Sequence, residues 1–431
     1  MVKVIPFKGV TYNYETIKNL DNLMSPPYDI ISEKMQTELY NKHPKNFVRL
    51  ILGKQNSDDN EENNRYTRAK ELLNQWFKES ILIESNKPSI FPYKIEYNID
   101  SKKKIMNGFF ILLKLDPEYK EVRAHEKTLS KPKEDRLNLM RACHSNLEPI
   151  QLLYIDDEDK IRKLIDESLY EPFINVKGYD NFNHKLWKID NIELISKIQN
   201  ELKDKILFIA DGHHRYQTAI NYSNELKDKN NENAPYNYRM VILANMFDYG
   251  LSILPTHRLI KKSDIDIKLF LNNIKEYFII EEKKVKIFGN NFKKISEKII
   301  KDLQTKKDHK FALYIKGSYY ILTLKDESFM DDFAKDKSKV WRTLDVSILH
   351  KIILEHFMNI NQNNIEDYIK YTRIDEEAVR FVEEGLYDFS FLMNATKINE
   401  LKAVAEAGEH MPQKSTYFLP KMLSGLVFYK M

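Results

Sequence analysis

Five consecutive residues near the middle of the chain have the side chains and the backbone freedom needed to bind phosphate. They are Asp211, Gly212, His213, His214 and Arg215. The apolar run 206–210 before them predicts a buried strand, and a helix is predicted from Tyr216 to about Leu226. Glycine at such a junction brings backbone N–H groups close to an anion, while the helix N-terminus and Arg215 add positive potential. The sequence therefore predicts a phosphate-binding turn.

The same five residues also have a purely structural interpretation. Asp211 can cap the helix, Gly212 can form the turn, and both histidines can hydrogen-bond locally. Many strand–turn–helix junctions need no more than this. Here, however, the junction carries four polar or ionisable groups that packing does not require, and such a cluster favours a binding site.

A second polar segment, 122–136, contains candidate acid–base groups. A carboxylate next to an imidazole suits proton abstraction, because burial and neighbouring charges can tune a glutamate to act as a base. A hydrated, charged loop is an equally good interpretation of this segment taken alone. The polar residues of interest are His125, Glu126, Thr128, Lys131, Lys133, Asp135 and Arg136.

Three short segments add polar groups whose role stays open. Residues 255–258 (Pro-Thr-His-Arg) supply Arg258 and an imidazole after a strand-like stretch. Residues 414–417 (Lys-Ser-Thr-Tyr) have a composition that can cradle phosphate but also commonly caps helices and turns. Residues 26–29 (Pro-Pro-Tyr-Asp) form either a rigid pocket wall or a turn. Taken alone, the first two segments favour a structural role.

Length and composition exclude several classes of protein. At 431 residues the chain exceeds the usual size of one hydrophobic core, so two domains are expected. With 42% hydrophobic and 31% charged residues, a soluble globular protein is expected, and no apolar run approaches the roughly 20 residues that cross a bilayer. The net charge of +4 gives no electrostatic argument for a nucleic-acid partner.

Cysteine content and common motifs narrow the chemistry further. Cys143 is the only cysteine, which excludes an internal disulfide and a zinc site built on several cysteines. No signal-peptide pattern is visible, so a reducing cytoplasm is expected. The glycine-rich P-loop, the dinucleotide fingerprint, His-Glu-x-x-His and Gly-x-Ser-x-Gly are all absent. If the protein binds a nucleotide, it must therefore do so through a phosphate-binding element other than these common motifs.

Hydrophobic periodicity predicts a mixed α+β or α/β architecture. Strands are predicted at 91–99 and 105–115 as a hairpin, at 149–155, 206–210 and 239–245, and as a second hairpin within 311–324. Helices are predicted from residue 33, around 69–77, and near 346–357, 376–385 and 398–407. The pattern becomes Lys-rich and amphipathic past Arg258, which places a domain boundary near residue 260.

Five segments together resemble the signature of a widespread prokaryotic family of unknown function. The resemblance is specific because several independent matches occur in one order over nearly the whole chain. A second proline expected in the last segment is Gln413 here, which matters little because proline offers no reactive group. The segments are 26–29, 125–128 (His-Glu-Lys-Thr), 211–215, 255–258 and 411–418 (Met-Pro-Gln-Lys-Ser-Thr-Tyr-Phe).

Residues 211–215 also look like the phosphate-binding turn of the ParB and sulfiredoxin superfamily, whose members include free serine kinases. This resemblance implies a ParB/sulfiredoxin-like nucleotide-binding core with an added sheet in residues 1–260. It implies a C-terminal α+β region, 261–431, that is rich in helix and contributes to the site. The implied activity transfers a phosphoryl group from ATP or ADP, with Mg²⁺, to the hydroxyl of free L-serine and yields O-phospho-L-serine.

The resemblance also assigns roles to individual residues. Glu126 is the first candidate for the catalytic base and Asp211 the second, with His125 beside them; Asp211 also binds Mg²⁺ or the acceptor hydroxyl. Nucleotide phosphates are expected on Gly212, His213, His214 and Arg215. The serine carboxylate or the transferred phosphate is expected on Arg258, Lys414, Ser415 and Thr416.

Two other functions stay open. A phosphohydrolase would use the same cradle but activate water, and it would release phosphate from phosphoserine or from nucleotide. A ParB-like nucleotide switch or DNA-associated module would modify no metabolite. The nearly balanced charge and the lack of a basic helix-turn-helix-like segment count against the switch. No nucleic-acid or membrane partner is expected, and a homodimer is allowed without being required.

Overall fold

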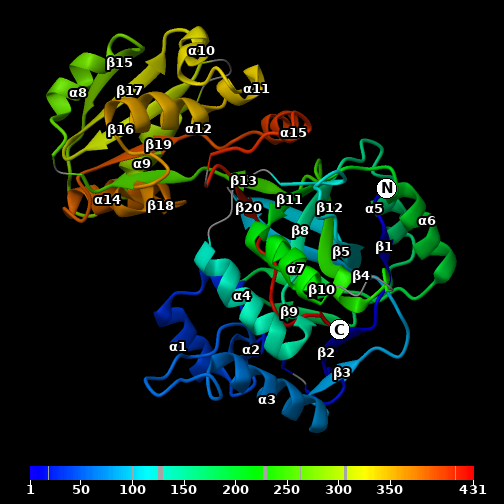
Figure 1. Ribbon diagram of the computed structural model, residues 1–431. Helices are drawn as coiled ribbons and strands as arrows, with labels where there is room; N and C mark the ends of the chain where they lie inside the picture. Colours follow the sequence, from blue (N-terminus) through cyan, green and yellow to red (C-terminus); the bar gives the residue numbers. More distant parts are fainter. Residues whose placement is uncertain are drawn as a thin grey trace. The chain divides into compact units, whose positions relative to one another are not determined.

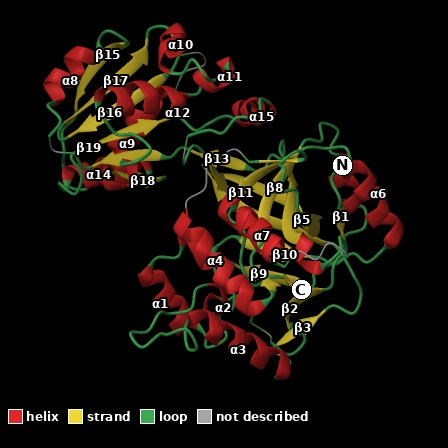
Figure 2. Cartoon of the chain, in the orientation of Figure 1, coloured by secondary structure: helices red, strands yellow, loops and turns green. Residues whose placement is uncertain are grey.

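A computed structural model of the protein describes residues 1–17, 19–99, 101–124, 130–226, 231–262, 264–304, 308–412 and 414–431. These residues form two compact units. Figures 1 and 2 show the strands and helices of each unit. The first unit takes its described residues from Met1–Ala124, Thr128–Ser252 and Pro420–Met431, and the second from Ile253–Leu419. The sequence placed a single boundary near 260, whereas the chain changes unit after Ser252 and again after Leu419.

The first unit is built on a nine-stranded mixed sheet, counted over the described residues. Its order is β6-β11-β8-β12-β5-β4-β10-β9, with β1 on β5. The pairs β6/β11 and β8/β12 are parallel, and the other pairs are antiparallel. The strands are β1 (Val4–Ile5), β4 (Phe91–Ile99), β5 (Lys102–Lys114), β6 (Val122–Arg123), β8 (Ile150–Tyr154), β9 (Ile174–Lys177), β10 (Asn183–Leu186), β11 (Leu207–Asp211) and β12 (Tyr238–Asn245).

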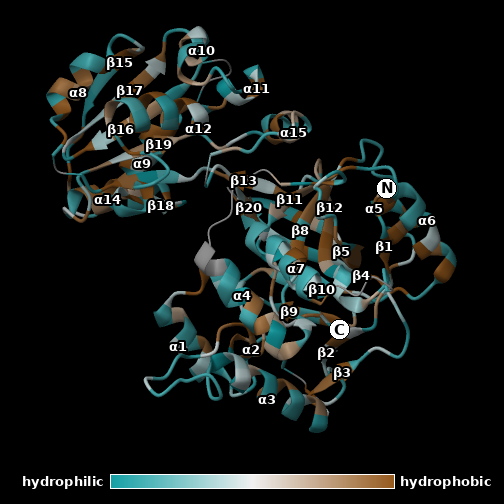
Figure 3. Ribbon diagram, in the orientation of Figure 1, coloured by the Kyte–Doolittle hydropathy of each residue, from teal (hydrophilic) through white to brown (hydrophobic). Residues whose placement is uncertain are grey.

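Helices cover one face of this sheet. Apolar residues of α5, α6 and α7, such as Ile161, Ile198 and Tyr216, join Val241 and Leu243 of β12 in one core. Strand β12 is buried along its whole length, and its apolar run 240–244 fits a central strand; the middle strands are accordingly brown in Figure 3. The helices are α1 (Glu33–Lys42), α2 (Val48–Ile51), α3 (Arg65–Lys78), α4 (Ser130–Cys143), α5 (Lys160–Asp166), α6 (Ile192–Leu202) and α7 (His213–Glu225), with 3₁₀ turns at Tyr28–Ile30 and Pro235–Asn237.

A small second sheet explains why the C-terminus returns to the first unit. Its order is β3-β2-β21-β7, so the last strand of the chain lies between two early ones. Phe428 of β21 is fully buried, and its ring lies 5.7 Å from that of Phe47. Burial of these apolar side chains stabilises the pairing of the last strand with strands that occur much earlier in the sequence. The strands are β2 (Gly9–Tyr12), β3 (Leu82–Glu84), β7 (Ser145–Asn146) and β21 (Phe428–Lys430).

Within the described residues, the second unit is built on a six-stranded antiparallel sheet of order β15-β17-β16-β19-β14-β18. Apolar residues of α9 and α14, among them Ile299 and Val379, pack on this sheet against Ala312 and Leu392. The sheet strands are β14 (His257–Ile260), β15 (Phe278–Lys284), β16 (Lys310–Ile315), β17 (Ser318–Leu324), β18 (Ile369–Thr372) and β19 (Phe389–Met393), and β13 (Ser252–Leu254) pairs with β20 (Tyr417–Leu419).

The remaining elements of the second unit are helical. The predicted helix near 346–357 is a short α-helix that continues as a π-helical stretch, Leu349–Phe357. The helices are α8 (Ile267–Ile274), α9 (Phe292–Leu303), α10 (Met330–Phe333), α11 (Lys339–Arg342), α12 (Asp345–Ile348), α13 (Ile365–Tyr368), α14 (Asp375–Glu383) and α15 (Ile398–Glu406), with a 3₁₀ turn at Glu327–Phe329.

The mixed α/β class predicted from the sequence is confirmed. The second unit contains many helices, as the α+β expectation for the C-terminal region implied, and a sheet forms its centre. Sequence periodicity detected its long hairpin but missed β14, β15, β18 and β19. The strands β14, β18 and β19 have only four or five residues, too few for alternation to stand out from chance, and β15 lies in a stretch that is interpreted from sequence only as Lys-rich and amphipathic.

We expect Phe428→Ala to destabilise the first unit by about 3–5 kcal/mol, because the change leaves a cavity in a fully buried site. Urea denaturation followed by circular dichroism would measure the loss. Phe247→Ala is the matched control, since this phenylalanine is 40% exposed, and it should cost much less. Equal effects of the two changes would contradict a structural role for the C-terminal strand.

Candidate functional site

The turn between β11 and α7 contains the predicted phosphate-binding residues. Asp211 ends β11, whose register against β8 shifts between Ile209 and Asp211. Gly212 follows as the N-cap of α7 with a φ of 91°, where an L side chain would be strained. The helix begins at His213, three residues before the predicted start at Tyr216. The periodic spacing of apolar residues detects only those helical turns whose side chains pack against the core. It therefore did not detect the first turn of α7, which is polar.

Asp211 is a largely buried carboxylate held between two cations. Its Oδ2 accepts a hydrogen bond from Nη2 of Arg215 at 2.5 Å, and its Oδ1 accepts one from Nζ of Lys421. Burial by itself would raise the pKa of Asp211, but Lys421 and Arg215 hold this pKa well below its ordinary value. Asp211 is therefore ionised at neutral pH and is a weak base.

Arg215 folds back beneath the start of its own helix. Only 5% of the residue is exposed, and Nη1 donates a hydrogen bond to the backbone oxygen of Pro149. A Cβ atom at Gly212 would lie 3.0 Å from Nε of Arg215, so the glycine also makes room for this side chain. Burial opposes the charge of Arg215, but Asp211 and Glu148 raise its pKa above the ordinary value. Arg215 therefore contributes mainly positive charge at the start of α7.

Sequence reasoning missed Lys421, the second cation of this site. The residue belongs to the C-terminal segment of the first unit and is 6% exposed. No motif distinguishes it from the other lysines of the chain. Only its burial beside Asp211 reveals its role, because lysine is rarely buried without a partner.

Residues 26–29 adjoin the same group of charges. The backbone N–H of Tyr28 donates a hydrogen bond to Oε1 of Glu148 at 3.0 Å. The Tyr28 ring lies 3.9 Å from Cζ of Arg136, and Nη1 of Arg136 donates a hydrogen bond to Oε2 of Glu148 at 3.2 Å. Because Glu148 also raises the pKa of Arg215, these charges interact as one group. The Pro-Pro-Tyr-Asp segment is thus a wall of this site.

Gln151 is another residue that sequence reasoning did not select. It lies on β8 directly opposite Asp211 of β11 and is 2% exposed. Neither Oε1 nor Nε2 of its amide has a hydrogen-bond partner among the described residues. A buried amide without partners is costly, which is typical of a place where water or a ligand binds. The Asp211 end of the sheet therefore has unused hydrogen-bonding capacity.

The first turn of α7 offers further donors. No side chain of the described residues caps this turn, and His213 is buried while His214 is partly exposed. The first N–H groups of a helix point out of its end and carry partial positive charge. Together with two cations around one carboxylate, they make a local excess of positive charge that suits an anion.

The other predicted site residues are distributed differently. His125, Glu126 and Thr128 lie outside the described residues. Lys414 is exposed, with a φ of 56°, and Thr416 is partly exposed. Ser415 is buried and donates its hydroxyl hydrogen bond to the backbone oxygen of Pro412. These last three residues belong to the second unit, whereas 211–215 belong to the first.

Arg258, also in the second unit, is a buried cation. It is 1% exposed, and its Nη1 donates a hydrogen bond to the backbone oxygen of Thr256. Its Nη2 lies 3.4 Å from Nε2 of His350. Burial, with Arg258 nearby, lowers the pKa of His350 well below its ordinary value, so this imidazole is neutral at physiological pH. Arg258 thus lies next to His350, which lines a pocket of the second unit.

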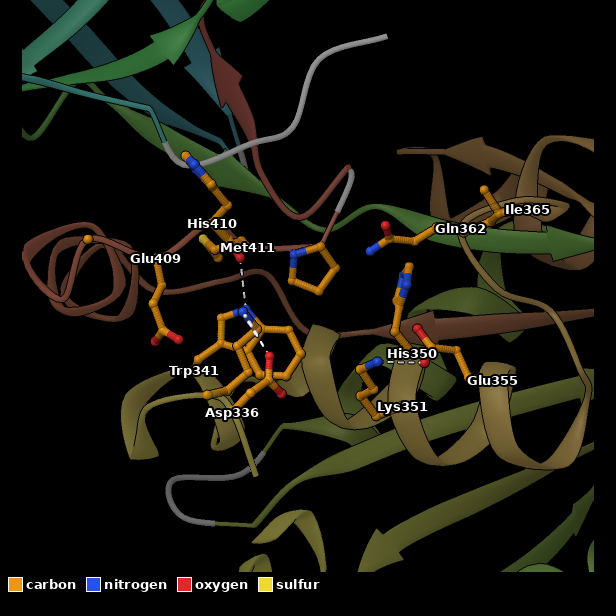
Figure 4. Close-up of a pocket in the computed structure, with 13 residues that line it drawn as sticks. Asp336, Trp341, His350, Lys351, Glu355, Gln362, Ile365, Glu409, His410 and Met411 are labelled. Carbon is orange, nitrogen blue, oxygen red and sulfur yellow. Dashed lines mark hydrogen bonds and ion pairs between the residues drawn. The ribbon is translucent and has the colours of Figure 1, made fainter. Parts of the chain in front are cut away.

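This pocket has a volume of about 350 Å³ and is shown in Figure 4. Trp341 lies on one side of it, and His350 and Gln362 lie on the other. Trp341 Nε1 donates a hydrogen bond to the backbone oxygen of His410 at 2.8 Å, which fixes the wall formed by residues 408–412. Met411 and Pro412 of the segment 411–418 therefore line this pocket, whereas the segment 255–258 is linked to it only through the contact of Arg258 with His350.

Comparison with known families gives a clear result. Residues 4–347 match the family described as "Protein of unknown function (DUF1015)". The chain belongs to the DUF1015 family. This confirms the membership that the five motifs implied, although the segment 411–418 lies beyond the matched range. A search of curated proteins finds no match.

Solved structures resemble this DUF1015 member only weakly. A free serine kinase in complex with AMP is 16% identical, with a TM-score of 0.36 over 75% of this chain and 90% of that one. A mutant free serine kinase in complex with ADP is 14% identical, with the same TM-score and coverage of 75% and 91%. A conserved hypothetical protein from Pyrococcus furiosus is 16% identical, with a TM-score of 0.33 and coverage of 72% and 90%. Scores this low carry no argument about function.

Two further properties of this family member concern metals and membranes. Among the described residues, no group of three His, Cys, Asp or Glu side chains is arranged to hold a metal ion. Asp211 already has two cationic partners, which makes it an unfavourable ligand for Mg²⁺ bound by the protein alone. Within the described part of the chain, no helix is both long enough and apolar enough to span a bilayer.

We expect Asp211→Asn to destabilise the protein by about 3–5 kcal/mol at pH 7, because it leaves Arg215 and Lys421 buried without their shared carboxylate. The folded-state pKa of Asp211 is depressed, so its contribution is present above the unfolded pKa of about 4 and is lost as the pH falls toward the folded value. Urea unfolding of both proteins at pH 7 and below pH 4 would measure this. A difference that grows on acidification would contradict the ion-pair role.

Proposed function

We propose that this protein is a nucleotide-dependent phosphotransferase that phosphorylates a small hydroxyl compound, with free L-serine as the acceptor and O-phospho-L-serine as the product. The observation that carries the proposal is the group formed by Asp211, Arg215 and Lys421 at the start of α7. The likeness of residues 211–215 to the phosphate-binding turn of the ParB and sulfiredoxin superfamily agrees with it.

The charges of this group favour phosphate over a neutral ligand. Two cations share one carboxylate, so one positive charge is left over at a largely buried position. The uncapped N–H groups of the first turn of α7 add to the same potential. A phosphate group supplies both the charge and the acceptor oxygens that this end of the helix needs.

In this proposal the residues of the turn divide into two roles. The backbone N–H groups at His213 and His214, with the His214 side chain, contact the phosphate oxygens, and Gly212 allows their close approach. Arg215, Lys421 and Asp211 are positioning residues, because the ion pairs fix the cations beneath the phosphate. Mg²⁺ would arrive on the phosphates of ATP or ADP and neutralise their charge, as it usually does in phosphoryl transfer.

The proposed reaction is in-line displacement at the terminal phosphorus of the nucleotide. The serine Oγ forms the new bond to phosphorus, the bond to the bridging oxygen breaks, and the shortened nucleotide leaves with the electron pair. The Oγ proton needs a base, and Glu126 is the better candidate because the low pKa of Asp211 makes it a poor one. Arg258, Lys414, Ser415 and Thr416 stay predictions for acceptor binding.

Incubation of the purified protein with isotopically labelled serine, MgCl₂ and either ATP or ADP should yield O-phosphoserine, detected by mass spectrometry. The two nucleotides, tested in parallel, identify the donor. Release of inorganic phosphate with unchanged serine would overturn the kinase and favour a phosphohydrolase. Nucleotide binding with no turnover of any kind would instead favour a nucleotide switch.

We expect His214→Ala to weaken nucleotide binding by about 10–100-fold, because one charge-assisted contact to phosphate is lost. His214 is the suitable choice because it is partly exposed, whereas replacement of buried Arg215 would unbalance the ion pairs. His43→Ala, at the end of α1, is the matched control and should leave affinity unchanged. Titration calorimetry with the Mg–nucleotide complex measures both. Unchanged affinity of His214→Ala would count against the proposed cradle.

A further inference from the structure

A small cavity in the first unit is lined by three arginines and one glutamate. Its volume is about 20 Å³, and its charged lining residues are Arg136, Arg215, Arg239 and Glu148. The rest of the wall is formed by Leu139, Met140 and Leu147 and by the hydroxyl residues Ser145 and Thr218. Each of these residues is less than 9% exposed. The cavity therefore concentrates positive charge in the interior of the unit.

Arg239 is the cation of this group that lacks an acidic partner. Arg136 contacts Asp135 and Glu148, and Arg215 contacts Asp211. The guanidinium of Arg239 instead donates one hydrogen bond, from Nη2 to the backbone oxygen of Glu148 at 2.8 Å. No carboxylate of the described residues lies within 4 Å of its nitrogen atoms, and Nε and Nη1 have no hydrogen-bond partner among these residues.

The surroundings of Arg239 make this charge costly. Burial, together with the nearby charge of Arg215, lowers the pKa of Arg239 to about 9, and the attraction of Glu148 only partly offsets this. At neutral pH the group is still protonated. A buried cation whose N–H groups are unused is unfavourable unless an anion or water compensates it.

We propose that the cavity binds one small inorganic anion of the size of chloride, which accepts hydrogen bonds from Nε and Nη1 of Arg239. Water could accept the same hydrogen bonds but would leave the excess charge uncompensated. A volume of 20 Å³ has room for roughly one or two water-sized particles, which suits a monatomic anion and is too small for a phosphate ester. The cavity shares Arg215 with the phosphate cradle, but the anion proposed here is held by Arg239, and its binding does not depend on the proposed enzymatic activity.

An anion that binds only the folded protein raises its melting temperature with concentration. We expect a rise of about 3–5 °C for each tenfold increase in chloride above its dissociation constant, measured at constant ionic strength with sodium gluconate as the balancing salt. Arg239→Met should abolish the chloride dependence, because it removes the charge while keeping an apolar side chain of similar length.

Arg141→Met is the matched control, since Arg141 is a largely exposed residue paired with Glu225, and its chloride dependence should equal that of the unaltered protein. Crystals of the unaltered protein soaked in bromide give a test that needs no variant. We expect an anomalous peak within hydrogen-bonding distance of Arg239 Nε and Nη1. Absence of that peak, or a peak with no chloride dependence of the melting temperature, which would mark an adventitious ion only, overturns the proposal.

Discussion

The arrangement of the first unit depends on one buried carboxylate, that of Asp211. It ends β11 and holds Arg215 from the next helix and Lys421 from the C-terminal segment. A single charge therefore ties the C-terminal segment to a strand–helix junction that lies 210 residues earlier in the chain. Without Asp211, the two cations would face each other in the interior, so the carboxylate determines how strand, helix and C-terminus come together.

The interior of the first unit has more positive than negative side chains around this point. Arg136, Arg215, Arg239 and Lys421 are all buried, while Glu148 and Asp211 are the carboxylates deepest among them. Proteins seldom bury uncompensated charge for packing reasons, because apolar residues of similar volume are at least as stabilising. We interpret this excess of positive charge as serving to bind anions, both at the start of α7 and in the cavity beside Arg239.

The second unit has a different character, with a pocket of mixed polarity and a neutral histidine. Arg258 reaches this pocket only through His350, and residues 411 and 412 form part of its wall. Of the signature segments that the structure describes, 26–29 and 211–215 thus lie with Glu148 and Asp211, whereas Arg258 and residues 411–412 lie at or next to the pocket of the second unit. Each group is held together by contacts inside its own unit.

The sequence alone determined the mixed fold class, the two long hairpins and the junction at 211–215, because these depend on local periodicity and on the backbone freedom of glycine. It also determined the family, through motifs read in order. Only the tertiary structure revealed Lys421, Gln151 and Arg239, since nothing local distinguishes them from other residues of their type. Their properties arise from burial and from neighbours distant in sequence, which no local pattern encodes.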